Sequence, residues 1–256
     1  MKNNRFVVIM AGGKGERFWP QSRLERPKHL LPIVGDAPML TQTLRRLDGL
    51  VPVENQIIIT NAEQRKLVLE VCSELPAENV IGEPIGRDTA AAVGLAALLV
   101  GRRSPDAVFA ILPADHIIEN TAGFQKVLNR AFVCAESESV LVTIGIKPNI
   151  PATGLGYIHK GEVSTSIDGV DVYSVQDFVE KPDLETAKSY LASGEYFWNA
   201  GMFIWGVKTV NAAFSQFVPE LHNALNNITT GLDKGDAIDD VLAEEYPKLE
   251  KISIDY

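Results

Sequence analysis

The chain has few of the residues on which several protein classes depend. Its 256 residues include only two cysteines, Cys72 and Cys134, and four histidines, and no Cys-x-x-Cys pair occurs. The sequence therefore indicates neither a disulfide framework nor a structural zinc site. Both cysteines lie in apolar stretches of helical pattern, so we expect them to be small core residues.

Long hydrophobic runs are also missing. The longest apolar stretch, residues 90–100, is far shorter than a membrane span and contains Gly94. The apolar run near the N-terminus is too short for the hydrophobic segment of a secretory signal. We therefore expect no membrane association and a cytoplasmic location.

Positive charge is scarce as well. The chain has 24 Lys and Arg residues against 33 Asp and Glu, which gives a net charge of −9. This balance argues against a broad nucleic-acid interface, although a few local cations can still bind a small anionic ligand. An apolar content of 46% and this length are sufficient for one large domain with a substantial core.

Short runs rich in Val and Ile alternate with helical patterns in the first part of the chain. Strands are predicted at residues 6–10, 56–60, 79–81, 108–112 and 140–146, all of them buried. Helices are predicted at residues 38–47, 62–75, 89–103 and 122–137, the last capped by Asn120 or Thr121. This alternation predicts a parallel sheet with helices on both faces and ligands at the carboxyl ends of the strands.

The pattern changes after Pro148. Longer, half-exposed strands are predicted at residues 156–163 and 170–180, and helices at 184–192, 207–217 and 238–246, before an apolar strand at the C-terminus. The predicted fold class is α/β, with a Rossmann-like, mostly parallel mixed sheet flanked by helices. We expect one domain, residues 1–256, in which residues 1–147 bind a nucleotide and residues 148–256 complete the pocket.

The first predicted strand is followed by the sequence AGGKGERFWPQSRLERPK. Its glycines, Gly12, Gly13 and Gly15, let backbone N–H groups approach phosphate oxygens. Arg17 and Lys28 add cationic donors that the backbone cannot supply. The combination favours binding of a nucleoside triphosphate, although the glycines alone would also suit a tight turn without a ligand.

Two common phosphate-binding loops are absent. A Rossmann dinucleotide fingerprint needs a third glycine where Phe18 stands, and a Walker loop would end in Gly-Lys-Ser or Gly-Lys-Thr. The missing glycine argues against a nicotinamide dehydrogenase, which we keep as a distant alternative.

The glycine-rich run together with Arg26-Pro27-Lys28 resembles the signature of the sugar nucleotidyltransferases, and among them the mannose-1-phosphate guanylyltransferases. The resemblance implies that the loop and Arg17 wrap the triphosphate and that Lys28 assists the leaving diphosphate. Further along the chain, the segment EPIGRDTA resembles the part of the family that recognises guanine. Its Asp88 is an equally good candidate for the cap of the following helix.

A carboxylate, Asp115, follows a predicted buried strand in the sequence LPADH. Magnesium prefers carboxylate oxygens combined with substrate phosphates, and the resemblance implies that Asp115 binds this ion. His116 is interpreted as a packing or supporting residue.

Two later segments complete the resemblance. The sequence TGLGYI resembles a sugar-approaching glycine segment, although alone it would suit a turn at the entry of a strand. In the segments FVEKP and WNAGMF, the resemblance implies that Glu180 and Asn199 bind sugar hydroxyls and that Lys181 holds the sugar phosphate.

Taken together, the resemblance implies four groups of residues. The catalytic residues are Arg17, Lys28, Asp115 and Lys181. The nucleotide-binding residues are Ala11, Gly12, Gly13, Gly15, Arg17, Lys28, Glu83, Arg87, Asp88, Thr89 and Asp115. The sugar-binding residues are Gly156, Glu180, Lys181 and Asn199, and the metal ligand is Asp115.

The implied reaction is attack by mannose 1-phosphate on the α-phosphorus of GTP, with release of diphosphate and with Mg²⁺ as cofactor. GTP and mannose 1-phosphate are the expected partners, without nucleic acid or membrane, and a homodimer is compatible with the sequence. Two alternatives stay open: transfer to another sugar 1-phosphate, such as that of glucose or a heptose, and nucleotide-sugar binding without turnover.

The family also has a second metal-binding Asp in a Trp-x-Asp-Val-Gly-like segment, which this sequence does not contain. We therefore expect the C-terminal part of the family domain to be missing here. Asp255 is interpreted as part of the apolar C-terminal strand rather than as a substitute ligand.

Overall fold

The computed structural model describes residues 4–13 and 27–255. Its strands are β1 (Arg5–Ala11), β2 (Gln56–Asn61), β3 (Val80–Glu83), β4 (Val108–Pro113), β5 (Val142–Ile146), β6 (Tyr157–Ile167), β7 (Val170–Val179) and β8 (Tyr196–Gly206). Its α-helices are α1 (Met39–Arg45), α2 (Arg65–Val71), α3 (Asp88–Arg103), α4 (Thr121–Ser137), α5 (Leu184–Ser193), α6 (Val207–Phe217), α7 (Pro219–Asp233) and α8 (Ile238–Glu245). Short 3₁₀ helices are η2 (Lys28–Leu30), η3 (Val53–Asn55), η4 (Ala62–Gln64), η5 (Ala77–Asn79) and η6 (Tyr246–Lys248).

The strands within these described ranges form one mixed sheet in the order β3-β2-β1-β4-β8-β6-β7, with β5 paired to β8. The first four strands of this order are parallel, and Val8 in β1 lies opposite Ile57 in β2 and Ile111 in β4. Parallel neighbours require crossover connections, and the helices between these strands supply them.

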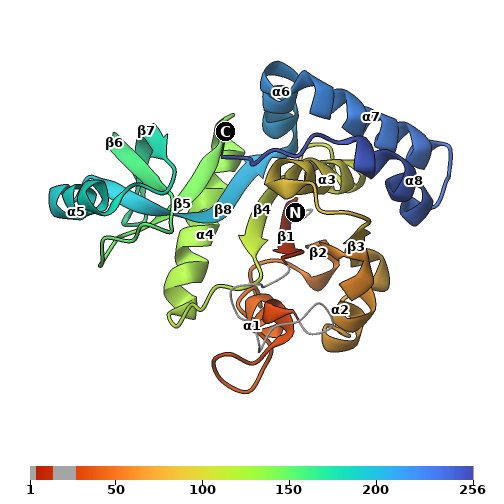
Figure 1. Cartoon of the computed structure of the whole chain (residues 1–256), viewed down its shortest axis with the longest axis horizontal. Helices are drawn as coiled ribbons and strands as arrows, with labels where there is room; N and C mark the ends of the chain where they lie inside the picture. The colour runs from red at the N-terminus through yellow and green to blue at the C-terminus, as the bar shows by residue number, and fades with distance from the viewer. Residues whose placement is uncertain (1–3, 14–26, 256) are drawn as a thin grey trace.

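Alternate side chains of β1 face opposite sides of the sheet and pack into two separate hydrophobic cores. Phe6 and Val8 belong to one core, together with α3, α6, α7 and α8, whereas Val7 and Ile9 belong to the other, together with α1, α2 and α4. Figure 1 shows the same two groups of helices on opposite faces of the sheet. A strand that is apolar on both faces needs helices packed on both sides of its sheet. The sequence of β1 therefore already indicates three layers, with the sheet between two layers of helices.

The long strand β8 connects the parallel strands to the second half of the chain. Phe203 near its C-terminal end lies opposite Ile111 of β4, and Trp198 near its N-terminal end lies opposite Tyr157 of β6. Both pairings are antiparallel, and β6 and β7 continue as a long hairpin that extends away from the helical layers (Figure 1). Because of these pairings, Asn199 and the C-terminal end of β7 lie on the same side of the sheet as the C-terminal ends of the parallel strands.

The predicted α/β fold class is confirmed, as are the buried, free states of Cys72 and Cys134 and the cap at Asn120, whose side chain accepts a hydrogen bond from Gly123 N. The sequence interpretation did not identify β8 or α7. No helix in the described part of the chain is both long and apolar enough to cross a bilayer.

Two local predictions were wrong. Strand β5 is half-buried at its start and exposed at its end, because it joins the sheet only through β8, beside the main strand order. Residues 252–255 form no strand, because their backbone is bonded to the start of α3: Ala90 N donates to Ile252 O, and Ile254 N donates to the Thr89 hydroxyl.

Candidate active site

The predicted nucleotide-binding residues gather where three parallel strands end. Gly12 and Gly13 follow β1, Glu83 is the last residue of β3, and Asp115 comes two residues after β4. Ala11 is buried at the end of β1, and one residue earlier the Met10 carbonyl accepts a hydrogen bond from Ala114 N at 3.1 Å. Because parallel strands end at the same edge of a sheet, residues far apart in sequence share one site.

Glu83 is packed against the glycine turn. Its side chain is buried, and a Cβ added to Gly12 would lie 3.1 Å from Glu83 Oε2, a tight contact that favours a residue without a side chain. The Tyr246 hydroxyl donates to Glu83 Oε1. Burial raises the pKa of Glu83 to about 7, and the hydrogen bond from Tyr246 acts in the opposite direction.

Tyr246 was missed by the sequence interpretation. It is fully buried, and burial together with the nearby Glu83 carboxylate raises the pKa of its hydroxyl, so Tyr246 stays a hydrogen-bond donor. Its position 163 residues from Glu83 leaves no local pattern by which the pair could be found.

Lys28 and Asp115 form an ion pair at this edge. Lys28 Nζ lies 2.9 Å from Asp115 Oδ2, and the two side chains are 21% and 43% exposed. The neighbouring His29 is buried, which lowers its pKa to about 4 against the attraction of Asp115, and burial also lowers the pKa of His116. Both imidazoles are thus neutral near pH 7, and Lys28 supplies the positive charge beside Asp115.

The start of α3 is held by contacts within the chain. Asp88 has a φ of 67°, and its Oδ1 accepts a hydrogen bond from Thr89 N at 2.8 Å. The helix begins at Asp88 itself and its cap position is Arg87, so the expected role of Asp88 as the cap is not observed. Arg87 Nη2 donates to the Pro247 carbonyl, which ties this loop to η6.

The predicted sugar-binding residues also come together. Asn199 N donates to Gly156 O at 2.9 Å, and a Cβ on Gly156 would lie 3.0 Å from Glu180 Oε2. Glu180 Oε1 accepts an ion-pair hydrogen bond from Lys181 Nζ, and Lys181 has a φ of 39°. The strand β8 thus brings Asn199 beside the end of the β6–β7 hairpin.

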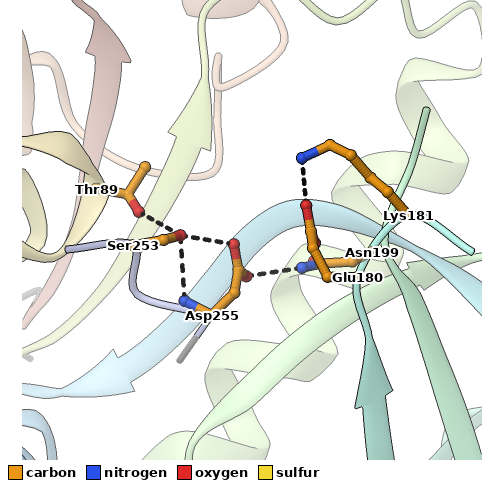
Figure 2. Close-up of polar contacts among 6 residues, drawn as sticks. All are labelled: Thr89, Glu180, Lys181, Asn199, Ser253 and Asp255. Atoms are coloured by element: carbon orange, nitrogen blue, oxygen red, sulfur yellow. Dashed lines mark hydrogen bonds and ion pairs between the residues drawn. The ribbon is translucent and has the colours of Figure 1, made fainter.

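Figure 2 shows a further contact that sequence reasoning did not identify: Asn199 Nδ2 donates to Asp255 Oδ1 at 2.9 Å. Ser253 Oγ donates to Asp255 Oδ2 at 3.0 Å, and the Thr89 and Ser253 hydroxyls are 3.2 Å apart. Residues 252–255 therefore run from the start of α3, which is predicted to recognise the base, to Asn199, which is predicted to bind the sugar. No sequence signal identifies this path, because it depends on how the chain returns across the sheet.

Gly15 and Arg17 lie outside the described residues, so their predicted roles remain predictions. Among the residues that the structure describes, no group of three or more His, Cys, Asp or Glu side chains could hold a metal ion. Asp115 is a half-exposed carboxylate beside Lys28. Such a donor fits a magnesium ion whose other ligands are mainly substrate phosphates and water.

A cavity of about 650 Å³ lies elsewhere, lined by α4, β5, the β6–β7 hairpin and Phe197. None of the predicted site residues lines it. The candidate active site is instead the open edge between the parallel strands and the hairpin.

Comparison with known proteins gives consistent results. The model of the nucleotidyl transferase family matches residues 6–235. The chain is 40% identical over 255 residues to a mannose-1-phosphate guanylyltransferase of Escherichia coli, covering 98% of this chain and 53% of that protein. It is 41% identical over 251 residues to one of Klebsiella pneumoniae, covering 97% of this chain and 53% of that protein.

A solved structure is similar in both sequence and fold. The crystal structure of a mannose-1-phosphate geranyltransferase from Thermus thermophilus superimposes with a TM-score of 0.86 at 34% identity, covering 99% of this chain and 70% of that one. The fold is therefore that of an α/β protein with a mixed, mostly parallel sheet flanked by helices. The chain belongs to the nucleotidyl transferase family, and it spans about half the length of the curated relatives it matches.

Proposed function

We propose that this chain transfers a guanylyl group from GTP to mannose 1-phosphate, forming GDP-mannose and diphosphate. The observation that carries the proposal is the convergence of the Lys28–Asp115 pair, the glycine turn and the Glu180–Asn199 cluster on one edge of the sheet. The two guanylyltransferases of about 40% identity support the choice of base and sugar. Residues 1–147 would bind the nucleotide and residues 148–256 the sugar, within one domain.

The chemistry requires alignment and charge neutralisation more than a protein nucleophile. A phosphate oxygen of the sugar attacks the α-phosphorus, the bond to the bridging oxygen breaks, and diphosphate leaves with both electrons of that bond. Lys28 would neutralise the negative charge that grows on the leaving diphosphate, and Arg17 would assist it. Lys181 would orient the attacking phosphate so that it lies in line with the leaving group.

The site also fits a magnesium ion. Asp115 would be its protein ligand, and a bound ion would supply charge neutralisation on the phosphate oxygens. A cytoplasmic location, small-molecule substrates without nucleic acid or membrane, and compatibility with a homodimer belong to the same proposal.

The sugar site suits a neutral polyol. Hydroxyl groups need hydrogen-bond acceptors and amides, and Glu180 and Asn199 offer both close to the Gly156 backbone. The phosphate of the same substrate needs a cation, which Lys181 supplies at the end of β7.

The proposal is tested by measuring diphosphate release from GTP and mannose 1-phosphate in the presence of Mg²⁺, with ATP, UTP and glucose 1-phosphate run in parallel. We expect release with GTP and mannose 1-phosphate alone. Release confined to another pair would mean that the chain uses a different nucleotide or sugar phosphate. A folded chain that releases no diphosphate with any pair would contradict nucleotidyl transfer.

The Lys28→Ala variant adds a test of mechanism. We expect turnover to fall about 100-fold, the usual loss when one charge-stabilising donor is removed, with little change in melting temperature. Lys208→Ala is the matched control, because Lys208 is also paired with an aspartate, Asp106, but is 77% exposed and unrelated to the site. Instability of Lys28→Ala comparable to a core mutation would contradict its proposed role.

A further inference from the structure

Residues 252–255, here called the strap, lie between the start of α3 and strand β8. The α3 end is fixed by Ala90 N donating to Ile252 O at 3.1 Å and Ile254 N donating to Thr89 Oγ1 at 2.9 Å. The β8 end is fixed by the contact between Asp255 and Asn199 (Figure 2). The strap therefore joins the segment proposed to bind the base with the cluster proposed to bind the sugar.

Counting hydrogens fixes the direction of the bonds in the strap. Ser253 has one hydroxyl hydrogen, and its Oγ donates to Asp255 Oδ2 at 3.0 Å. In the contact between Ser253 and Thr89, the Thr89 hydroxyl must therefore be the donor. Both oxygens of Asp255 act as acceptors, one from Ser253 and one from Asn199, so its carboxylate is held in a defined orientation.

The same contacts define the orientation of the Asn199 side chain. Its Oδ1 accepts a hydrogen bond from Gly201 N at 3.0 Å, and its Nδ2 donates to Asp255 Oδ1. An ionised carboxylate cannot donate a hydrogen bond. The Asn199 atom that faces Asp255 must therefore be the donor Nδ2 and not the acceptor Oδ1. These bonds use one of the two Nδ2 hydrogens and one lone pair of Oδ1.

We propose that Asp255 is a positioning residue of the sugar site, which fixes the Asn199 amide and adds its own carboxylate as an acceptor for sugar hydroxyls. The inference rests on the proposed function and deepens it. Asp255 is exposed, and each of its oxygens can accept more than one hydrogen bond. Glu180, Asn199 and Asp255 then offer two carboxylates and one amide to a polyol, while Lys181 serves its phosphate.

Equilibrium binding of GDP and of GDP-mannose to the 256-residue chain, measured by calorimetry with Mg²⁺, tests this inference without requiring turnover. We expect wild type to bind GDP-mannose more tightly than GDP. Asp255→Ala should weaken GDP-mannose binding about tenfold, the effect of losing hydrogen bonds to a charged acceptor, and leave GDP binding unchanged. Ser253→Ala should cause a smaller loss of the same kind.

Two further variants separate positioning from general structure. Asp255→Asn keeps an acceptor for Asn199 Nδ2, so it should recover part of the loss seen with Asp255→Ala. Asp106→Ala, at an exposed aspartate paired with Lys208, is the matched control and should bind both ligands as wild type does. Circular dichroism melting curves would confirm that each variant is folded.

The outcomes distinguish the inference from the function on which it rests. If Asp255→Ala binds both ligands as wild type does, or weakens both equally, Asp255 does not position the sugar, although the proposed function stands. If the folded wild-type chain binds neither ligand, or binds GDP-mannose no better than GDP, the proposed sugar site itself is wrong and the inference falls with it.

Discussion

Two glutamates illustrate how differently the two sides of the candidate site are built. Glu83 lies against Gly12 and Glu180 lies against Gly156, and a Cβ on either glycine would approach the carboxylate to 3.1 or 3.0 Å. Glu83 is buried and bonded to Tyr246 from a distant part of the chain, whereas the Glu180 side chain is 41% exposed and paired with its neighbour Lys181. The side of Glu83, which is the proposed nucleotide side, is fixed by the core, and the side of Glu180, which is the proposed sugar side, is fixed by polar contacts near the surface.

Each side also contains a non-glycine residue with a positive φ, Asp88 at 67° and Lys181 at 39°. Such a backbone costs on the order of 1–3 kcal/mol and persists only when surrounding contacts hold it. Asp88 accepts a hydrogen bond from Thr89, which is itself bonded to the strap, whereas Lys181 contacts the adjacent Glu180. The comparison predicts that perturbing the first side affects the stability of the whole domain, whereas perturbing the second mainly affects ligand binding.

The largest expected effect is on the core beneath the nucleotide side. Phe109 in β4 is fully buried, and Phe109→Ala should lower the free energy of unfolding by about 3–5 kcal/mol through lost packing and the resulting cavity. Phe178 in β7 is 43% exposed, and Phe178→Ala should cost less than about 1 kcal/mol. Urea unfolding of both variants measures the difference, and equal losses would remove the contrast between the two sides.

The second prediction concerns the buried carboxyl of Glu83. Its pKa is raised from 4.5 to about 7 in the folded state, so the unfolded chain loses this proton at lower pH than the folded chain does. The contribution of Glu83 to stability therefore falls as the pH rises from 4.5 to about 7, by up to about 3 kcal/mol. Glu83→Gln removes this loss and keeps an acceptor for Tyr246, so the variant should gain stability over wild type at about pH 8 but little at about pH 4.5.

His29 provides the opposing control. Its pKa is lowered from 6.5 to about 4. The contribution of the neutral imidazole to folding stability is therefore fully present above pH 6.5 and is lost as the pH falls toward 4. The two slopes oppose each other in wild type between pH 4.5 and 6.5. The His29→Gln variant should therefore lose stability with rising pH more steeply than wild type. Urea midpoints across this range measure both slopes, and a Glu83→Gln gain that is independent of pH would contradict the proposed shift.

The same contrast explains how much could be predicted from sequence. Strands β1, β2 and β4 and helices α3 and α4 follow from local periodicity, because each is long, apolar and bounded by clear turn residues. Asp115 could be expected at the ligand-binding edge because it follows a buried strand, whereas Lys28 and Glu83 were expected there from the family resemblance. Their detailed partners, such as Tyr246, could not be predicted, because burial joins residues that are far apart in sequence.

On the sugar side, less could be predicted. The strand β8 contains the polar break Asn199-Ala-Gly, which interrupts any run of strand-forming residues. The strap was expected to be an apolar strand, as the family resemblance implied. Its backbone groups bond instead to the start of α3. Only the completed fold shows that Asp255 lies beside Asn199.

The smallest expected effect on stability belongs to the Lys181–Glu180 pair. The two side chains are 55% and 41% exposed, and exposed ion pairs contribute on the order of 0–1 kcal/mol. Lys188 is a matched control, because its side chain is 54% exposed and paired with Glu185 on α5. We expect Lys181→Ala and Lys188→Ala to unfold within about 0.5 kcal/mol of each other.

Of these two variants, only Lys181→Ala should raise the KM for mannose 1-phosphate, because Lys181 lies at the proposed sugar site and Lys188 does not, and the KM for GTP should change little. Steady-state kinetics with each substrate varied in turn measures this difference. A loss of stability confined to Lys181→Ala would mean that the positive φ at this position depends on its side-chain contacts. The sugar side would then share the structural coupling that distinguishes Glu83, and the division between a core-fixed and a surface-fixed half of the site would no longer hold.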